Sequence, residues 1–365
     1  MFSNILITGA TGFVGANLAI KLLTEFDFNL FLIVRSSKNL SAEERICSLF
    51  SKYLGEDYKK YVKRVFVVTG DVTRDNFGLD KQLYDELSQK IDCIFHSAAS
   101  INFKLSLEES MNINVQGTKN VLEFSRQCMK NGQFKKFNHI STAYVAGNTK
   151  ELFLESQLDI GQEFENTYEI SKFETEKMVN RYIDEGFPIT IFRPSVIAGN
   201  FTTGEITESN LIFGFIKQIS SSRYKEFICN EDSSLNIIPI DYFVDAMLDI
   251  SFQKNSLGKT YHLVNKHNSS IMEMVKICCE VAKVRLPEFV PLDNKEKTSL
   301  RTRLLLEVFL PYIEKSHKFD DSIAQENLNA KNISCPIVDN MFMKRTIEYC
   351  LENNMISLKG ECYGN

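Results

Sequence analysis

The chain has 365 residues, 44% of them hydrophobic, so it can bury a large core and is long enough for one large domain and a smaller lobe. Its net charge of -5, without a basic stripe interleaved with aromatic residues, argues against nucleic-acid binding. No run is long enough to span a bilayer, the first strand begins too early for a signal peptide, and neither the nine cysteines nor the five histidines show metal-ligand spacing, so we expect a cytoplasmic protein without a metal.

Apolar runs alternate with helical stretches through the first 200 residues, a pattern typical of parallel β-α units. Strands are expected at residues 4–7, 30–34, 65–68, 137–140, 189–192 and 261–264. Helices are expected at residues 16–23, from a capping box at Ser41 and Glu44 onward, and at residues 168–182.

A glycine-rich turn joins the first strand to the first helix. Thr8 to Gly15 reads T-G-A-T-G-F-V-G. In that context Gly9 permits a tight turn, Gly12 lets backbone approach a pyrophosphate, and Gly15 lets the helix pack on the strand. The spacing is G-x-x-G-x-x-G, and an ordinary strand-to-helix turn is the alternative. The context favours a dinucleotide site.

The second strand ends at Arg35, where a site that prefers NAD carries an acidic residue for the ribose 2′-hydroxyl. A guanidinium can instead pair with a 2′-phosphate and stack on adenine, so Arg35 favours NADPH. The alternative is a solvated arginine at a strand end.

A hydroxyl, a phenol and an ammonium complete the predicted site. The strand at residues 137–140 delivers Ser141 and Thr142 to its end, and Tyr168 and Lys172 lie four residues apart on one face of a helix. A phenol needs its anion stabilised to act at neutral pH, and the charge of a lysine one turn away provides this. A surface Tyr-Lys pair is the alternative. Together with the glycine turn, the set predicts nicotinamide-dependent hydride chemistry.

With these residues, the chain resembles an extended short-chain dehydrogenase/reductase, and within that superfamily the male-sterility-type branch of fatty acyl-CoA reductases and thioester reductase domains. The resemblance covers residues 1 to about 265 and is loose beyond, apart from Phe319-Asp320. It is carried by the motifs at residues 96–103, 114–118, 140–145, 166–168, 193–197, 238–242 and 261–265. It implies a Rossmann-type doubly wound α/β sheet in residues 1–200 with a returning segment at about 236–265. A smaller, mostly helical substrate lobe would comprise residues 201–235 and 266–365.

The resemblance also implies roles for single residues. Thr142, Tyr168 and Lys172 fall on the catalytic positions, and Asn114 on one that supports the lysine. Asp71 falls where the family contacts adenine, and residues 98–99 and 194–197 fall beside the nicotinamide end. The full set expected to bind NADPH is Thr8, Gly9, Thr11, Gly12, Phe13, Val14, Gly15, Arg35, Asp71, Val72, Ser97, Ala98, Ala99, Tyr168, Lys172, Pro194, Ser195, Val196 and Ile197.

The function that the resemblance implies is NADPH-dependent reduction of an acyl thioester, on CoA or a carrier protein, to an aldehyde and from there, as an open alternative, to the alcohol. Two other functions stay open. One is a different extended-family enzyme, such as a sugar-nucleotide epimerase or dehydratase or a hydroxysteroid-type dehydrogenase. The other is a non-catalytic NADP(H) sensor. The acyl group, the pathway and the oligomeric state are left undetermined.

Three further interpretations concern parts outside the motifs. His96 and His139 are interpreted as hydrogen-bonded strand-end residues rather than catalysts. In the lobe, either a substrate pocket or ordinary core would use Phe201, Leu211, Phe213, Phe215 and Ile216. A helix with Lys295, Lys297, Arg301 and Arg303 could bring an acidic carrier or a CoA phosphate to the mouth of the site and cover an acyl chain, and the alternative is a helix buried on one side and solvated on the other.

Overall fold

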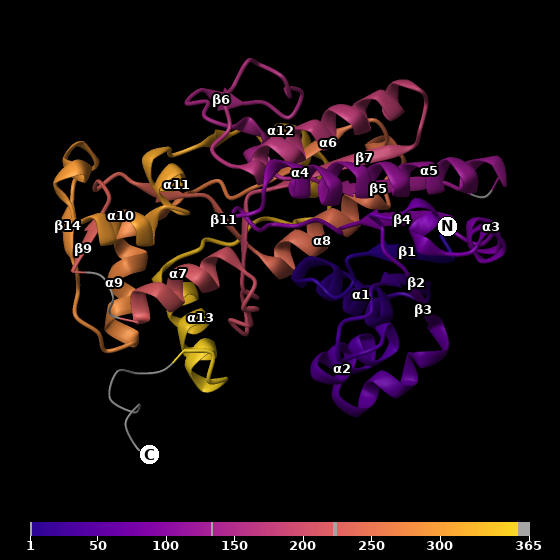
Figure 1. Cartoon of the computed structure of the whole chain (residues 1–365), viewed down its shortest axis with the longest axis horizontal. Helices are drawn as coiled ribbons and strands as arrows, with labels where there is room; N and C mark the ends of the chain where they lie inside the picture. Colours follow the sequence, from indigo (N-terminus) through magenta and orange to yellow (C-terminus); the bar gives the residue numbers. More distant parts are fainter. Residues whose placement is uncertain (1, 133, 222–224, 357–365) are drawn as a thin grey trace.

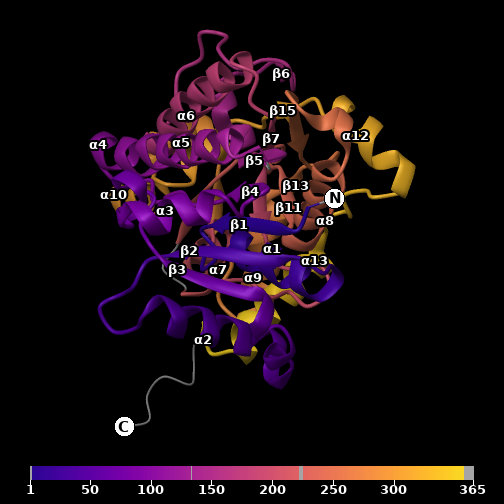
Figure 2. The ribbon, with the colours of Figure 1, turned by 90° about the vertical axis from the view of Figure 1, so that its right-hand side faces the viewer.

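A seven-stranded parallel sheet organises the larger part of the molecule (Figures 1 and 2). The computed structural model describes residues 2–132, 134–221 and 225–356. The strand order is β3-β2-β1-β4-β5-β7-β12, and every neighbouring pair is parallel. The strands are β1 Asn4–Thr8, β2 Asn29–Val34, β3 Val65–Thr69, β4 Cys93–His96, β5 Lys136–Ile140, β7 Ile189–Pro194 and β12 Thr260–Leu263. The predicted α/β doubly wound fold is confirmed.

Helices cover both faces of the sheet because its strands are apolar on both faces. Along β1, Ile5 and Ile7 join one core and Leu6 joins the other, as the alternation of side chains in a strand requires. The first face is covered by α1 Phe13–Glu25, α2 Ala42–Leu54 and α8 Ile240–Ser251, and the second by α3 Lys81–Ser88, α5 Gly117–Lys130 and α6 Thr167–Asp184. The predicted capping box at the start of α2 is confirmed, since Ser41 and Glu44 make both of its hydrogen bonds.

A second lobe with its own core lies beyond the carboxyl ends of the central strands, at the left of Figure 1. Its helices are α7 Leu211–Ser220, α9 Ile271–Val281, α10 Leu300–Leu306, α11 Leu310–Glu314 and α13 Asn340–Glu352. Short paired strands accompany them: β9 Glu226–Ile228 with β14 Glu288–Val290, and β10 Ser234–Leu235 with β13 Ser269–Ser270. The pair β8 Val196–Ala198 and β11 Ile237–Pro239 connects the two parts.

One segment of the expected lobe packs on the sheet domain instead. β15 Lys318–Phe319 pairs with β6 Leu152–Phe153, and α12 Ser322–Leu328 places Ala324 and Leu328 in the core beneath α1 and α8. The assignment of all of residues 266–365 to the lobe is therefore wrong for this stretch. Its apolar residues recur at helical spacing, which predicts a buried face without saying which core buries it.

A buried ion pair fixes the position of α6 over the sheet. Glu176 on α6 and Arg193 on β7 are almost completely buried and bound to each other, and the guanidinium also reaches His262 Nε2 at 3.1 Å and the Gln157 carbonyl at 2.7 Å. Ser141 donates to the other carboxylate oxygen at 2.6 Å. Because burial is costly for an unpaired charge, this set of bonds holds α6 in one register.

The described ranges contain no helix that is long and apolar enough to cross a bilayer. Within the same ranges, no group of three or more His, Cys, Asp or Glu side chains is arranged to hold a metal ion.

Candidate active site

The glycine turn has the geometry that its spacing predicts. Gly9 has φ +74°, and a Cβ there would lie 2.7 Å from the Ala98 nitrogen, so the turn lies directly against the end of β4. A Cβ on Gly15 would lie 2.3 Å from the Gly9 oxygen. Gly12 caps α1 without a side-chain bond and is exposed, so the first N–H groups of the helix face the cleft free of a capping side chain.

Thr8 supports this turn from within the core rather than from the cleft. Its side chain is fully buried, and its hydroxyl pairs with His96 Nδ1 at 2.7 Å and accepts from the Ala98 N–H at 3.3 Å. His96 Nε2 in turn pairs with the Thr118 hydroxyl at 2.8 Å. Thr8 therefore holds the turn and the Ser97–Ala99 segment in register.

Two arginines flank the end of β2. Arg35 is exposed, and its Nη1 lies 3.9 Å from the Asp71 carboxylate. Arg45, on the second turn of α2, donates to the Thr11 hydroxyl at 3.2 Å and to the Arg35 carbonyl. The sequence reasoning missed Arg45. The sequence could have indicated it, because the capping box at Ser41 sets the start of α2 and so places Arg45 one turn after the N-cap.

The carboxyl end of β7 supplies the other side of the cleft. Pro194 ends β7 and Val196 begins β8, so the chain bends at Ser195. The Ser195 N–H donates to the Leu263 carbonyl at 3.1 Å, while its buried hydroxyl has no hydrogen-bond partner within the described residues. An orphaned buried hydroxyl at this position fits a site for a polar ligand group such as a carboxamide.

Thr142, Tyr168 and Lys172 meet where β5 and α6 approach. Thr142 is the second residue after β5, and Tyr168 is the second residue of α6, which Asn166 caps. Desolvation raises the pKa of Tyr168 to about 12, and a hydrogen bond with the Thr142 hydroxyl offsets only part of this rise. Burial lowers the pKa of Lys172 to about 8, and its ammonium donates to the Ile140 carbonyl at 2.8 Å.

That the charge of Lys172 stabilises the Tyr168 phenolate stays a prediction. The lysine is oriented toward the Ile140 carbonyl, and the desolvation of the phenol outweighs the favourable hydrogen bond from Thr142. Tyr168 is therefore a protonated hydrogen-bond donor at neutral pH.

Asn114 lies in a π-helical turn, Met111–Gln116, that precedes α5. Its amide nitrogen donates to the Ser171 hydroxyl at 2.8 Å and to the Ser100 carbonyl at 3.2 Å, and its oxygen accepts from the Ser100 N–H at 2.8 Å. Because Ser171 precedes Lys172, Asn114 holds the turn of α6 that carries the lysine. Helical bulges of this kind are frequent at functional sites.

The two strand-end histidines behave differently. Their rings are 5.8 Å apart, and burial together with the nearby Lys172 lowers the pKa of His96 to about 3 and that of His139 well below its usual value. His96 is hydrogen-bonded through both nitrogens, as expected. The expectation is wrong for His139, because neither of its ring nitrogens has a partner within the described residues. Both rings are neutral at physiological pH.

A contact between α6 and the lobe lies beside Tyr168, and no local sequence pattern indicates it. The Tyr312 hydroxyl of α11 donates to Glu169 Oε1 at 2.7 Å and accepts from the Asn166 amide at 2.9 Å. Glu169 directly follows Tyr168, and burial raises its pKa to about 7. Lys315 and Glu165 form an ion pair alongside. These bonds join residues about 145 positions apart, which no local pattern reveals.

The five lobe residues take two kinds of position, and whether they form a substrate pocket or ordinary core stays open. Leu211 and Phe215 line a small apolar cavity. Phe213 and Ile216 are buried in the lobe core, and Phe201 stacks on Phe342 with ring centroids 5.9 Å apart.

The basic segment at residues 295–303 leads into α10 and adjoins an open groove of about 450 Å³ between α10 and α11. Two of its four cations are paired, Lys295 with Glu314 at 2.7 Å and Arg303 with Glu296. Leu300 and Leu304 are 64% and 60% exposed while Leu306 is buried. Arg301 is exposed beside them and Thr302 is buried beside Leu306, so α10 is buried on one side and exposed on the other, as the alternative interpretation expected.

The chain belongs to the family described as male sterility protein, whose profile matches residues 7–247. The resemblance inferred from the motifs is confirmed. Among relatives, the chain is 33% identical over 276 residues to cpsA, a nonribosomal peptide synthetase of Aspergillus campestris, covering 71% of this chain and 25% of that protein. It is 26% identical over 297 residues to the fatty acyl-CoA reductase wat of Drosophila melanogaster, covering 71% of this chain and 57% of that protein. The chain therefore spans about a quarter to about half of such relatives.

Solved structures share the whole architecture. The terminal R domain from the myxalamid PKS-NRPS biosynthetic pathway superposes with a TM-score of 0.81 at 25% identity, covering 98% of this chain and 92% of that one. UDP-glucuronic acid 4-epimerase from Bacillus cereus, in complex with NAD, gives a TM-score of 0.68 at 19% identity, covering 95% of this chain and 98% of that one. The second likeness shows a shared fold alone.

The buried charge of Lys172 yields a prediction on stability. Below pH 8 the folded protein carries a desolvated ammonium, whereas the unfolded chain keeps its proton up to pH 10.5. Lys172→Met should therefore raise the free energy of unfolding at pH 7 by about 1–3 kcal/mol. This advantage should shrink as the pH rises from 8 to 10.5. Denaturant unfolding at several pH values measures it. Lys177→Met, which removes a half-buried lysine of the same helix that is paired with Glu174, is the control, and a destabilised Lys172→Met protein at pH 7 would contradict the assignment.

Proposed function

We propose that this protein reduces acyl thioesters to aldehydes with NADPH. The observation that carries the proposal is the convergence of Thr142, Tyr168 and Lys172 at the carboxyl edge of the sheet, the edge that also carries the glycine turn, in a chain of this family. A bound nicotinamide supplies the hydride.

The residues of the chain deal with the charge that develops on the carbonyl oxygen. The hydroxyls of Thr142 and Tyr168 are the donors that stabilise an oxyanion, and the phenol can transfer its proton to that oxygen. Lys172, charged below pH 8, stabilises the phenolate left behind and can restore its proton. A thiolate is a good leaving group, so the adduct collapses when its carbon–sulfur bond breaks and the hydroxyl proton passes to the departing sulfur, directly or through Tyr168. This gives an aldehyde and a free thiol without an acyl-enzyme.

The family and its relatives favour thioester reduction over the epimerase-type alternative. The chain matches the male sterility protein family, and relatives are named as a fatty acyl-CoA reductase and a peptide synthetase. The likeness to UDP-glucuronic acid 4-epimerase, at 19% identity, concerns the fold alone. The presence of Thr142, Tyr168 and Lys172 together supports an enzyme over a non-catalytic sensor.

The preference for NADPH is supported by two guanidiniums at the end of β2. Arg35 is exposed and Arg45 is held against Thr11 of the glycine turn, so both can reach an anionic group bound beside the turn. A 2′-phosphate is such a group, and planar guanidiniums bind phosphate oxygens in pairs.

The thioester carrier is proposed from the relatives. Relatives named as fatty acyl-CoA reductases and as peptide synthetases support CoA and a carrier protein respectively. Either carrier holds the acyl group on a thiol, which is the leaving group that the mechanism uses. Whether a second hydride takes the aldehyde on to the alcohol is open.

Arg45→Ala should discriminate between the cofactors. Loss of a charge-assisted contact to a 2′-phosphate should lower kcat/KM for NADPH by about 10- to 100-fold and leave that for NADH within about twofold. Steady-state kinetics with both cofactors measures this. Arg285→Ala, an exposed arginine of the lobe, should change neither. An equal loss with NADPH and NADH would exclude a phosphate-binding role.

Tyr168→Phe tests the catalytic assignment. Removal of the phenolic proton should lower the rate of thioester-dependent NADPH oxidation by at least about 100-fold, whereas the dissociation constant for NADPH should change by less than about threefold. Absorbance at 340 nm measures the rate and NADPH fluorescence measures the binding. A variant that keeps near-normal turnover would show that Tyr168 does not donate the proton.

A further inference from the structure

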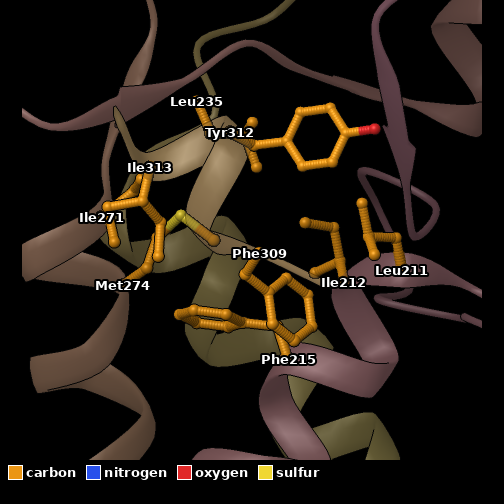
Figure 3. A pocket seen from close by; sticks show the side chains of 9 residues that line it. All are labelled: Leu211, Ile212, Phe215, Leu235, Ile271, Met274, Phe309, Tyr312 and Ile313. Atoms are coloured by element: carbon orange, nitrogen blue, oxygen red, sulfur yellow. The ribbon is translucent and has the colours of Figure 1, made fainter. Parts of the chain in front are cut away.

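The lobe contains a small, partly open cavity with an apolar lining (Figure 3). It lies between α7, α9 and α11, and its walls include Leu211, Phe215, Met274, Phe309, Tyr312 and Ile313. The cavity measures about 20 Å³, about the size of one water-sized probe. Such a cavity offers a water molecule no hydrogen bond, so it suits an apolar group.

Tyr312 separates this cavity from the catalytic residues. One side of its ring lines the cavity, and Figure 3 shows the phenol oxygen pointing away from Met274 and Ile313. That oxygen is bound to Glu169, the residue after Tyr168. The Tyr312 ring also packs edge-on against Tyr144, with centroids 5.1 Å apart.

The Phe103 ring lies between the rings of Tyr168 and Tyr312 and contacts both. The Phe103 ring lies 5.6 Å from that of Tyr168 and 6.1 Å from that of Tyr312. An acyl group with its carbonyl carbon at Tyr168 would therefore extend along Phe103 and meet the Tyr312 ring next. At its present volume the cavity cannot hold a chain of several carbons, so the Tyr312 ring has to turn for a chain to enter.

We infer that Tyr312 controls the entry of an aliphatic acyl chain into this cavity and so sets the chain-length preference of the enzyme. This inference rests on the proposed thioester reduction, for which it names the substrate as an uncharged, mainly saturated acyl chain. The hydrogen bond to Glu169 holds the ring in the closed position. Its loss favours longer chains, and filling the far end of the cavity favours shorter ones.

The alternative is that Tyr312 only clamps α11 to α6. A clamp would change kcat/KM for all substrates by one factor, whereas control of chain entry changes the ratio between long and short chains. The readout is therefore the ratio of kcat/KM for decanoyl-CoA to that for acetyl-CoA, with hexanoyl-CoA between them.

Four variants of the full chain separate the two readings. The ratio should rise about three- to tenfold in Tyr312→Phe, which keeps the ring, and at least about tenfold in Tyr312→Ala, since each buried methylene is worth about fourfold in affinity. It should fall about tenfold in Met274→Phe, which fills the cavity wall opposite the cleft. Tyr349→Phe, in α13, is the matched control and should leave it unchanged. A uniform change at all chain lengths in both Tyr312 variants would overturn the inference.

A binding measurement separates this inference from the proposed function. The series hexanol, octanol and decanol should raise the Tm of the wild type progressively, and Met274→Phe should abolish the trend. Thioester turnover without chain-length dependence, together with alkanol shifts that Met274→Phe leaves intact, would overturn the inference and leave the function standing. Alkanol shifts that depend on Met274, in a protein that reduces no thioester, would refute the function and retain the chain-binding cavity.

Discussion

The site depends on the burial of one ammonium group. Lys172 is 3% exposed, and its bond is to a backbone carbonyl at the end of β5 rather than to a carboxylate. A buried ammonium without a carboxylate partner is costly, so the surrounding structure has to keep it in place. Asn114 bonds to Ser171 on one side of it, and the Glu176–Arg193 pair anchors α6 one turn later. These polar contacts hold α6 in place and so keep the Lys172 ammonium buried, although hydration would favour its exposure.

Low polarity around that charge explains the protonation states of its neighbours. His96 and His139 are neutral, Tyr168 keeps its proton, and burial brings the pKa of Glu169 to about 7. A site of this kind strengthens every interaction with a developing oxyanion. The same desolvation therefore lowers the pKa of Lys172 and raises that of Tyr168.

Much of the nucleotide domain could be predicted from the sequence because its signals are local. The glycine spacing, the capping box at Ser41 and the four-residue interval from Tyr168 to Lys172 each lie within a short stretch of the sequence. The structure contains all three. What the sequence did not reveal depends on long-range packing. Arg45 is recognised as a site residue by its hydrogen bond to Thr11, and Tyr312 by its hydrogen bond to Glu169. Both bonds join residues too far apart in the sequence for a local pattern to predict. The packing of α12 into the core shared by α1 and α8 also depends on long-range contacts. So does the lack of partners for the His139 ring nitrogens within the described residues.

The central claim is that the substrate carbonyl belongs to a thioester, and the release of thiol tests it most directly. With an acyl-CoA and NADPH, free thiol measured by a colorimetric disulfide reagent should appear together with NADPH oxidation, one thiol for each NADPH if the aldehyde is released and one for every two if the alcohol is. NADPH oxidation by ketones or sugar nucleotides alone, with no thiol released from any acyl-CoA or acyl-carrier substrate, would contradict the claim.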